Sequence, residues 1–188
     1  MVYPIEVYGS PILRKVSVDI PINHPDLKQL IADMFETMYG AEGMGLAAPQ
    51  IGLNFRLIVI DTTQLSKEEP AEDGFKMILV NPKIIEYSGP EILYNEGCLS
   101  LPGIREEVSR PDEVLLEYYD EHCIFHTETF TGLRARVIQH EIDHIEGKLF
   151  IDRIAPIRKK LLKGRLSDIS KGLIETRYRI RIPGKPNR

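Results

Sequence analysis

The His-Glu-x-x-His pattern at residues 140–144 constrains this chain more than any other feature of its sequence. Residues four apart lie on the same face of an α-helix, so His140 and His144 can reach one metal ion. Glu141 would then lie beside the two ligands, near enough to act on a metal-bound water. The same pattern also arises by chance on amphipathic helices with two exposed histidines, and the rest of the sequence has to decide between these interpretations.

A catalytic site of the zinc type needs three protein ligands and one open position. Metzincin-type proteases place a third histidine six residues after the second, where this chain has Phe150. Thermolysin-like proteases use a glutamate on a following helix, whereas only Glu146 and Glu175 follow this motif, one too close and the other in a predicted strand. The upstream candidate is Cys98, whose thiolate would complete a Cys-His-His set.

Hydrophobic periodicity predicts both helices and strands. Apolar residues recur every three or four positions between Pro25 and Tyr39, and a second helix should carry the histidine pair from Thr131 to about Glu146. A basic helix is expected over 154–170, and a polar, acidic loop over 62–76. Strands are expected at 56–61, 77–87, 105–109, 113–119, 124–130 and 176–182, with turns at Ser88-Gly89-Pro90 and Pro111-Asp112.

These elements predict an α+β fold in which short antiparallel β-sheets pack around the central helix that carries the motif. The length suits one catalytic domain over 1–188, with 158–188 as a basic helix and strand at its end. In the glycine-containing stretch 43–52, Gly43 and Gly45 let another backbone approach, but the run before Pro49 is not expected to open a helix. By itself this stretch could be a ligand-binding loop or an ordinary turn.

Composition and charge limit the classes of partner that this protein is expected to bind. No segment approaches the roughly 18–20 uninterrupted apolar residues of a membrane span, and the N-terminal residues lack the basic flank and apolar core of a secretory signal. We therefore expect a cytoplasmic protein that binds neither a membrane nor DNA. Residues 158–188 contain eleven Lys and Arg against two acidic residues, although the whole chain has a net charge of −4. Only this tail has the positive charge that could attract a polyanion.

Three separated segments together resemble the peptide deformylase family. They are Gly43-Met44-Gly45-Leu46-Ala47-Ala48-Pro49-Gln50, Glu96-Gly97-Cys98-Leu99-Ser100 and Gln139-His140-Glu141-Ile142-Asp143-His144. Their order and spacing also match the family, and the resemblance covers essentially the whole chain apart from the basic tail.

The resemblance implies an enzyme that removes the N-formyl group from the N-terminal formyl-methionine of newly synthesised polypeptides and releases formate. Cys98, His140 and His144 would hold one divalent metal, usually Fe²⁺, with Zn²⁺, Ni²⁺ or Co²⁺ able to replace it. A metal-bound water would be the nucleophile, and Glu141 would be the general acid and base.

The resemblance also assigns roles around the metal. The side-chain amide of Gln50 and the backbone N–H of Leu99 would donate hydrogen bonds to the developing oxyanion. Three polar residues would orient the metal ligands: Glu96, Gln139 and Asp143. The residues expected to contact an extended substrate and its methionine side chain are Met44, Gly45, Leu46, Gly97, Arg105, Leu133 and Val137.

Two alternatives belong to other classes. A generic metallopeptidase would cut unformylated peptide bonds, and a non-enzymatic metal-stabilised domain would be indifferent to the loss of the Glu141 carboxylate. The basic tail that begins at Arg158 is predicted either to dock at the ribosome, where nascent chains emerge, or to be a solvated helix and strand.

Overall fold

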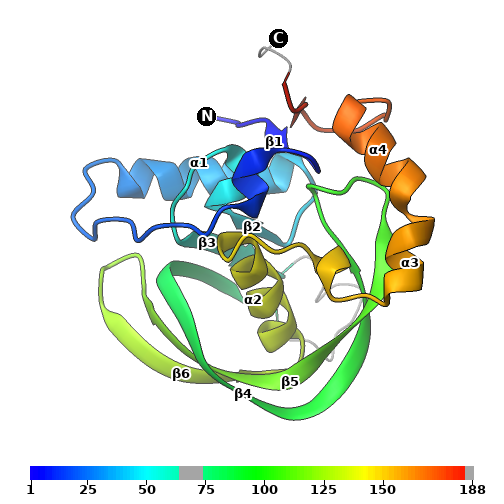
Figure 1. Ribbon diagram of the computed structural model, residues 1–188. Helices are drawn as coiled ribbons and strands as arrows, with labels where there is room; N and C mark the ends of the chain where they lie inside the picture. The colour runs from blue at the N-terminus through cyan, green and yellow to red at the C-terminus, as the bar shows by residue number, and fades with distance from the viewer. Residues whose placement is uncertain (64–73, 185–188) are drawn as a thin grey trace.

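The structure is a computed structural model that describes residues 1–63 and 74–184 (Figure 1). Most of the acidic loop predicted over 62–76 therefore lies outside the described residues. The elements in chain order are β1 (Ile5–Glu6), η1 (Pro11–Arg14), α1 (Leu27–Gly40), β2 (Gly45–Ala47), η2 (Ala48–Ile51), β3 (Leu57–Asp61), β4 (Lys76–Gly97), β5 (Arg105–Tyr119), β6 (Phe125–Thr131), α2 (Gly132–Ile145), η4 (Phe150–Asp152), α3 (Pro156–Leu161), α4 (Lys163–Lys171) and β7 (Ile180–Arg181).

Helix α2, which carries the histidine pair, lies at the centre of the fold with the curved strands β4, β5 and β6 wrapped around it (Figure 1). Ten of its fourteen residues are buried, so polar side chains as well as apolar ones point into the protein. Buried polar groups are stable only when they are hydrogen-bonded or ligate a metal. The position of α2 therefore requires partners for its histidines and carboxylates.

The main sheet is antiparallel throughout, with the strand order β2-β3-β4-β5-β6. Strand β3 is buried on both faces because Leu57 and Val59 pack with α1, whereas Ile58 and Ile60 pack with α2. The two helices thus cover opposite faces of this part of the sheet, and the predicted α+β class is confirmed. None of the described helices is long and apolar enough to cross a membrane.

The two turns predicted at Ser88-Gly89-Pro90 and Pro111-Asp112 are wrong. Both segments lie within the long strands β4 and β5, where Glu91 pairs with Pro111 beside a register shift between Ser88 and Glu91. A β-bulge accepts proline and a glycine of positive φ, and Gly89 has φ 77°. The glycine and proline residues therefore bend a continuous hairpin instead of ending its strands.

The stretch after β2 also differs from expectation, because Ala48 and Pro49 open the 3₁₀-helix η2. Proline is well suited to the first turn of a helix, where a backbone N–H has no partner to lose. This turn ends at Gly52, whose φ of 84° is left-handed. As a result, Gln50 lies inside a short rigid helix instead of a loose turn.

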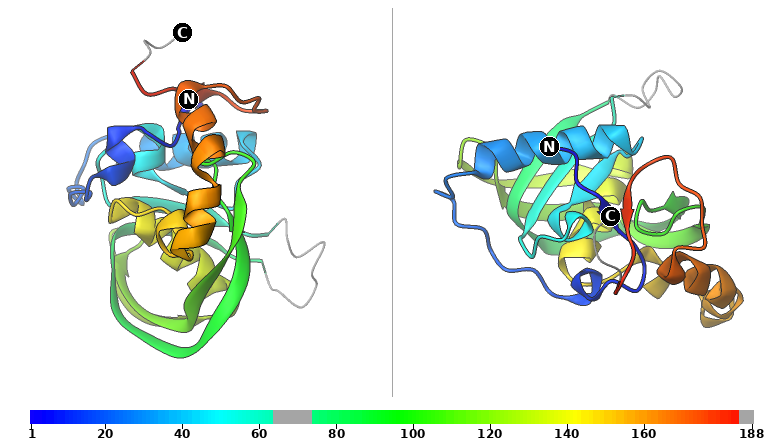
Figure 2. Two further views of the ribbon diagram at one scale, coloured as in Figure 1. Left: turned by 45° about the vertical axis from the view of Figure 1, so that its right-hand side comes forward. Right: turned by 90° about the horizontal axis from the view of Figure 1, so that it is seen from above.

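The C-terminal tail folds back onto the N-terminus. The predicted helix over 154–170 is present as two pieces, α3 and α4, which meet at Leu162. The predicted strand over 176–182 is shorter, and β7 pairs in parallel with β1, joining Ile180 to Ile5 (Figure 2). The fold therefore contains a second, two-stranded sheet that ties both ends of the chain together.

Candidate metal centre and active site

Three candidate ligands from distant parts of the chain meet at one point. Cys98 directly follows the end of β4, and His140 and His144 occupy successive turns of α2. One ligand atom from each residue lies within 4.8 Å of the others, and Cys98 Sγ is 3.2 Å from His144 Nε2. The grouping matches the Cys-His-His set expected from the sequence.

The chemistry of these donors fits a divalent transition metal. His140 Nδ1 is 2.9 Å from Glu96 Oε2, which leaves its Nε2 to face an ion. Burial raises the pKa of the Cys98 thiol, but the neighbouring His144 and His140 imidazoles outweigh this and lower that pKa to about 5. A thiolate is the form that binds metals. A thiolate with two imidazoles suits Fe²⁺, Co²⁺, Ni²⁺ and Zn²⁺ alike.

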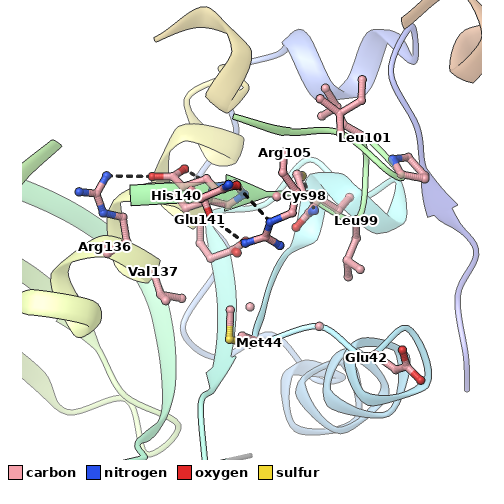
Figure 3. Close-up of a pocket in the computed structure, with 18 of the residues that line it drawn as sticks. Glu42, Met44, Cys98, Leu99, Leu101, Arg105, Arg136, Val137, His140 and Glu141 are labelled. Carbon is pink, nitrogen blue, oxygen red and sulfur yellow. Dashed lines mark hydrogen bonds and ion pairs between the residues drawn. The ribbon is translucent and has the colours of Figure 1, made fainter. Parts of the chain in front are cut away.

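An arginine that the sequence reasoning missed holds the carboxylate behind His140. Arg110 on β5 is fully buried, donating from Nε and Nη2 to Glu96 over 2.7 and 2.9 Å, and from Nη1 to Asp143 Oδ2 over 2.7 Å. Arg136 donates to Glu96 Oε1 over 3.0 Å (Figure 3). Burial opposes ionisation of Glu96, but Arg110 and His140 hold the pKa of this carboxyl well below its usual value.

A signal for Arg110 was present in the alternation of its strand. Glu106, Val108, Arg110, Val114 and Leu116 are in phase, and all are buried. A charged residue in phase with buried valines needs a partner of opposite charge. The partner itself could not be identified without the pairing between β4 and β5.

The three residues predicted to orient the metal ligands have different hydrogen-bond partners in the structure. Glu96 contacts His140 as expected, whereas Asp143 pairs with Arg110 and with Arg153. Gln139 Nε2 donates to the Pro111 carbonyl over 2.8 Å. Gln139 and Asp143 each precede a histidine, so they lie about 100° around the helix from the ligand face. Among the described residues neither Gln139 nor Asp143 hydrogen-bonds a candidate ligand, and Asp143 is linked to His140 through Arg110 and Glu96.

A cavity of about 390 Å³ opens beside the three ligands. In Figure 3, Cys98, His140 and Glu141 lie at its centre, with Met44 and Val137 on the side below them. The sequence-predicted residues that line it are Met44, Gly45, Gln50, Gly97, Cys98, Leu99, Arg105, Leu133, Val137, His140 and Glu141.

The expectation for Leu46 is corrected by the structure, since this side chain is fully buried in the core with α1 and does not line the cavity. Successive residues of a strand point to opposite faces. Gly45 and Ala47 of β2 face α2, and Leu46 consequently faces α1. Arg105 is exposed at the rim, where it donates to the Asn95 carbonyl over 2.6 Å.

The carboxylate of Glu141 is packed directly against the backbone of Gly45. A Cβ atom at position 45 would lie 2.4 Å from Glu141 Oε1, so only glycine allows this approach. Glu141 Oε2 is buried and has no hydrogen-bond partner among the described residues. Burial also raises the pKa of this carboxyl. The Glu141 carboxylate thus lines the cavity with unused hydrogen-bonding capacity.

One predicted oxyanion donor points towards the Cys98 sulfur, and the other belongs to the residue after Cys98. The Ala47 N–H donates to Gln50 Oε1 over 2.8 Å, which directs Gln50 Nε2 towards Cys98 Sγ, 3.7 Å away, and Ser100 Oγ, 3.3 Å away. The Leu99 N–H makes no hydrogen bond to another residue within 1–63 and 74–184. Both predicted oxyanion donors therefore lie next to the predicted metal ligand.

Comparisons with known proteins agree with this geometry. The sequence model of a family described as polypeptide deformylase matches residues 2–160. The chain is 46% identical to the peptide deformylase of Christiangramia forsetii over 97% of both chains, and 49% identical to that of Flavobacterium johnsoniae over 96% of both. The crystal structure of a peptide deformylase from Legionella pneumophila is similar with a TM-score of 0.80 and 36% identity, covering 92% of this chain and 98% of that one. The chain belongs to the peptide deformylase family of metal-dependent hydrolases.

Proposed function

We propose that this protein hydrolyses the formyl amide at the N-terminal methionine of newly synthesised polypeptides and releases formate. The observation that carries the proposal is the Glu141 carboxylate, which lines the cavity beside the cluster of Cys98, His140 and His144. When bound, a divalent ion supplies a Lewis acid that acidifies water and polarises a carbonyl oxygen. We propose Fe²⁺ as the physiological ion, with Zn²⁺, Ni²⁺ and Co²⁺ as substitutes.

Glu141 is proposed to move the proton during hydrolysis. Its carboxylate takes a proton from the attacking water and passes it to the amine that leaves. A raised pKa suits both steps, because the carboxyl must accept the proton and then give it up near neutral pH. The carboxylate lines the cavity and has no protein partner at Oε2 among the described residues, so it can take up the proton without breaking an existing hydrogen bond.

Gln50 and Leu99 are proposed to stabilise the negative charge that develops on the formyl oxygen. Gln50 Nε2 is held in direction by the Ala47 N–H, and the Leu99 N–H is free of other described residues. Donors that are oriented before the reaction stabilise charge without reorganising during it. Such preorganisation favours the transition state over the bound substrate.

The cavity is suited to a peptide in an extended pose. Among the strands of the described residues, β2 lies at the edge of the main sheet and pairs with β3 alone. A free strand edge can accept an extended peptide through backbone hydrogen bonds, while pockets accept alternate side chains. The apolar residues Met44, Leu133 and Val137 are proposed to surround the methionine side chain.

Formate release is the direct test of the activity. Protein freed of metal by a chelator is expected to release no formate from formyl-Met-Ala-Ser, and to regain activity when loaded with Fe²⁺ without air or with Co²⁺, Ni²⁺ or Zn²⁺. Unformylated Met-Ala-Ser serves as the matched substrate. Cleavage of its peptide bonds would support a general peptidase, and inactivity with all four metals would support a binding domain.

A methyl group at position 45 should disable the site without unfolding the protein. Gly45→Ala would displace the Glu141 carboxylate, and a misplacement of about 1 Å can cost about 10²-fold in rate. We expect a loss of that order in kcat/KM with an unchanged content of bound metal. Gly164→Ala is the control, because no atom of the described residues outside its own helix backbone and chain neighbours lies within 4 Å of the added Cβ. Full activity of Gly45→Ala would show that the Glu141 position is not critical.

Docking of the basic tail on the ribosome stays a prediction. Lys160 and Lys163 are exposed on α3 and α4. Arg158, in contrast, pairs with Glu106 over 2.9 Å and so contributes less to the positive surface.

A further inference from the structure

The C-terminal segment over 173–182 lies beyond the residues that the family model matches, yet it reaches the candidate metal centre. Three contacts anchor it to the N-terminal strand. Ile180 pairs with Ile5, the Ile5 N–H donates to the Arg179 carbonyl over 2.9 Å, and Arg181 Nη1 donates to Glu6 Oε1 over 2.8 Å.

Tyr178 projects from this segment into the wall of the cavity. Its ring packs against the core that contains α1, and its hydroxyl donates to the Leu99 carbonyl over 2.8 Å. Leu99 is the residue whose N–H is proposed to contact the formyl oxygen. The tail therefore contacts the segment that supplies both a metal ligand and an oxyanion donor.

A single peptide group connects the Tyr178 hydroxyl to the Cys98 sulfur. The carbonyl of Leu99 and the N–H of Ser100 belong to the same planar peptide unit. At one end this unit accepts the hydrogen bond from Tyr178, and at the other end the Ser100 N–H donates to Cys98 Sγ over 3.4 Å. A hydrogen bond at the carbonyl polarises the peptide and strengthens its N–H as a donor.

The same short segment is held from two other directions. The Tyr8 N–H, which follows β1, donates to the Ser100 carbonyl over 2.9 Å, and the Leu101 N–H donates to the Cys98 carbonyl over 3.0 Å. Neither contact restrains the Leu99–Ser100 peptide plane at its carbonyl end. Within the described residues, Tyr178 supplies the hydrogen bond that does so.

We propose that Tyr178 is a positioning residue that tunes the Cys98 ligand through the Leu99–Ser100 peptide. The proposal rests on the proposed function, because it takes Cys98 as a metal ligand. Partners of metal ligands orient those ligands and adjust the charge on them. In this chain the tail supplies such a partner, so β7 and β1 would contribute to the metal site as well as to the fold.

Replacement of the hydroxyl alone tests this role. Tyr178→Phe keeps the ring in the core, and we expect the Kd for Co²⁺ to rise about 10-fold. We also expect the sulfur-to-cobalt charge-transfer band to move to longer wavelength, because a thiolate with a weaker hydrogen bond gives up its electrons more easily. Chelator competition measures the first quantity and the absorption spectrum measures the second.

Two variants separate the hydroxyl from the general attachment of the tail. Tyr3→Phe removes a hydroxyl from a residue that packs in the same core but lies outside the cavity, and it should leave the Kd and the spectrum unchanged. Arg181→Gln weakens the pairing with Glu6 and should lower the thermal stability without moving the band.

The outcomes distinguish this proposal from the proposed function. If Tyr178→Phe matches the unmodified protein in both Kd and spectrum, or if Arg181→Gln moves the band equally, the role of the hydroxyl is refuted. If the unmodified protein shows no sulfur-to-cobalt band or releases no formate, the proposed function itself fails. A lower unfolding temperature in Tyr178→Phe with an unchanged spectrum would also refute tuning and leave a structural role.

Discussion

Glu141→Gln is expected to lower kcat/KM for formyl-Met-Ala-Ser by about 10²–10⁴, the usual contribution of a general acid and base. Glutamine has nearly the same volume, so it should fit against Gly45, but its amide cannot accept and return a proton. The candidate metal ligands Cys98, His140 and His144 are untouched, and the metal content should stay at that of the unmodified protein. Formate release and elemental analysis of the same preparation measure both quantities.

Glu146→Gln is the matched control on the same helix end. Glu146 pairs with Arg56 over 2.6 Å in a partly buried position outside the cavity, so its loss should leave kcat/KM unchanged. Retention of activity by Glu141→Gln would contradict the proposed proton transfer and favour a binding domain. Loss of the metal together with the activity would instead identify Glu141 as part of the metal-binding set.

Arg110→Met is expected to destabilise the protein by about 3–5 kcal/mol, the cost of breaking a buried ion pair from one side. Arg110 is fully buried, and its removal would leave Glu96 and Asp143 with fewer partners in a region that excludes water. Methionine fills a similar volume, so the loss of stability should not come mainly from a cavity. The midpoint of urea unfolding should fall while its slope remains the same.

The same substitution should weaken metal binding, because Glu96 orients His140. Arg14→Met is the control, since its ion pair with Asp152 is partly exposed and such pairs contribute about 0–1 kcal/mol. An Arg110→Met protein as stable as the Arg14→Met protein would mean that Arg136 and Arg153 suffice for the two carboxylates.

The arginine network also has a pH signature. The folded-state pKa values of Glu96 and Asp143 are lowered, in each case because arginine contacts outweigh burial. Their contribution is therefore present above the unfolded pKa of about 4, and it is lost as the pH falls through the folded values. Arg110→Met should lose less stability on acidification than the unmodified protein does, because much of this contribution is already gone.

Local patterns predicted most of the helices and strands. The boundaries of α2 and β3 were close because helical period and strand period are set by neighbours in the chain. The turn at Ser88-Gly89-Pro90 was wrongly predicted because glycine and proline mark a bulge and a turn equally well. Only pairing with β5 decides which of the two forms.

The motif residues were predictable for a different reason. His140, Glu141 and His144 share a local helical spacing, and Cys98 was inferred by eliminating other third ligands and then from the family resemblance. Leu46 was misplaced because a motif does not reveal which face of a strand each residue occupies. That face depends on the sheet register against β3, which sends Leu46 to α1.

The sequence by itself determined the helix that carries two candidate ligands, the choice of the three candidate donors and the family of the chain. Each of these depends on short-range spacing or on residue identity, which the sequence states directly. The tertiary structure alone decided that Arg110 holds Glu96 and that Tyr178 reaches the Leu99 carbonyl. These contacts join segments 14 and 79 residues apart, and they exist because strand pairing and burial bring together groups that have no pattern in common along the chain.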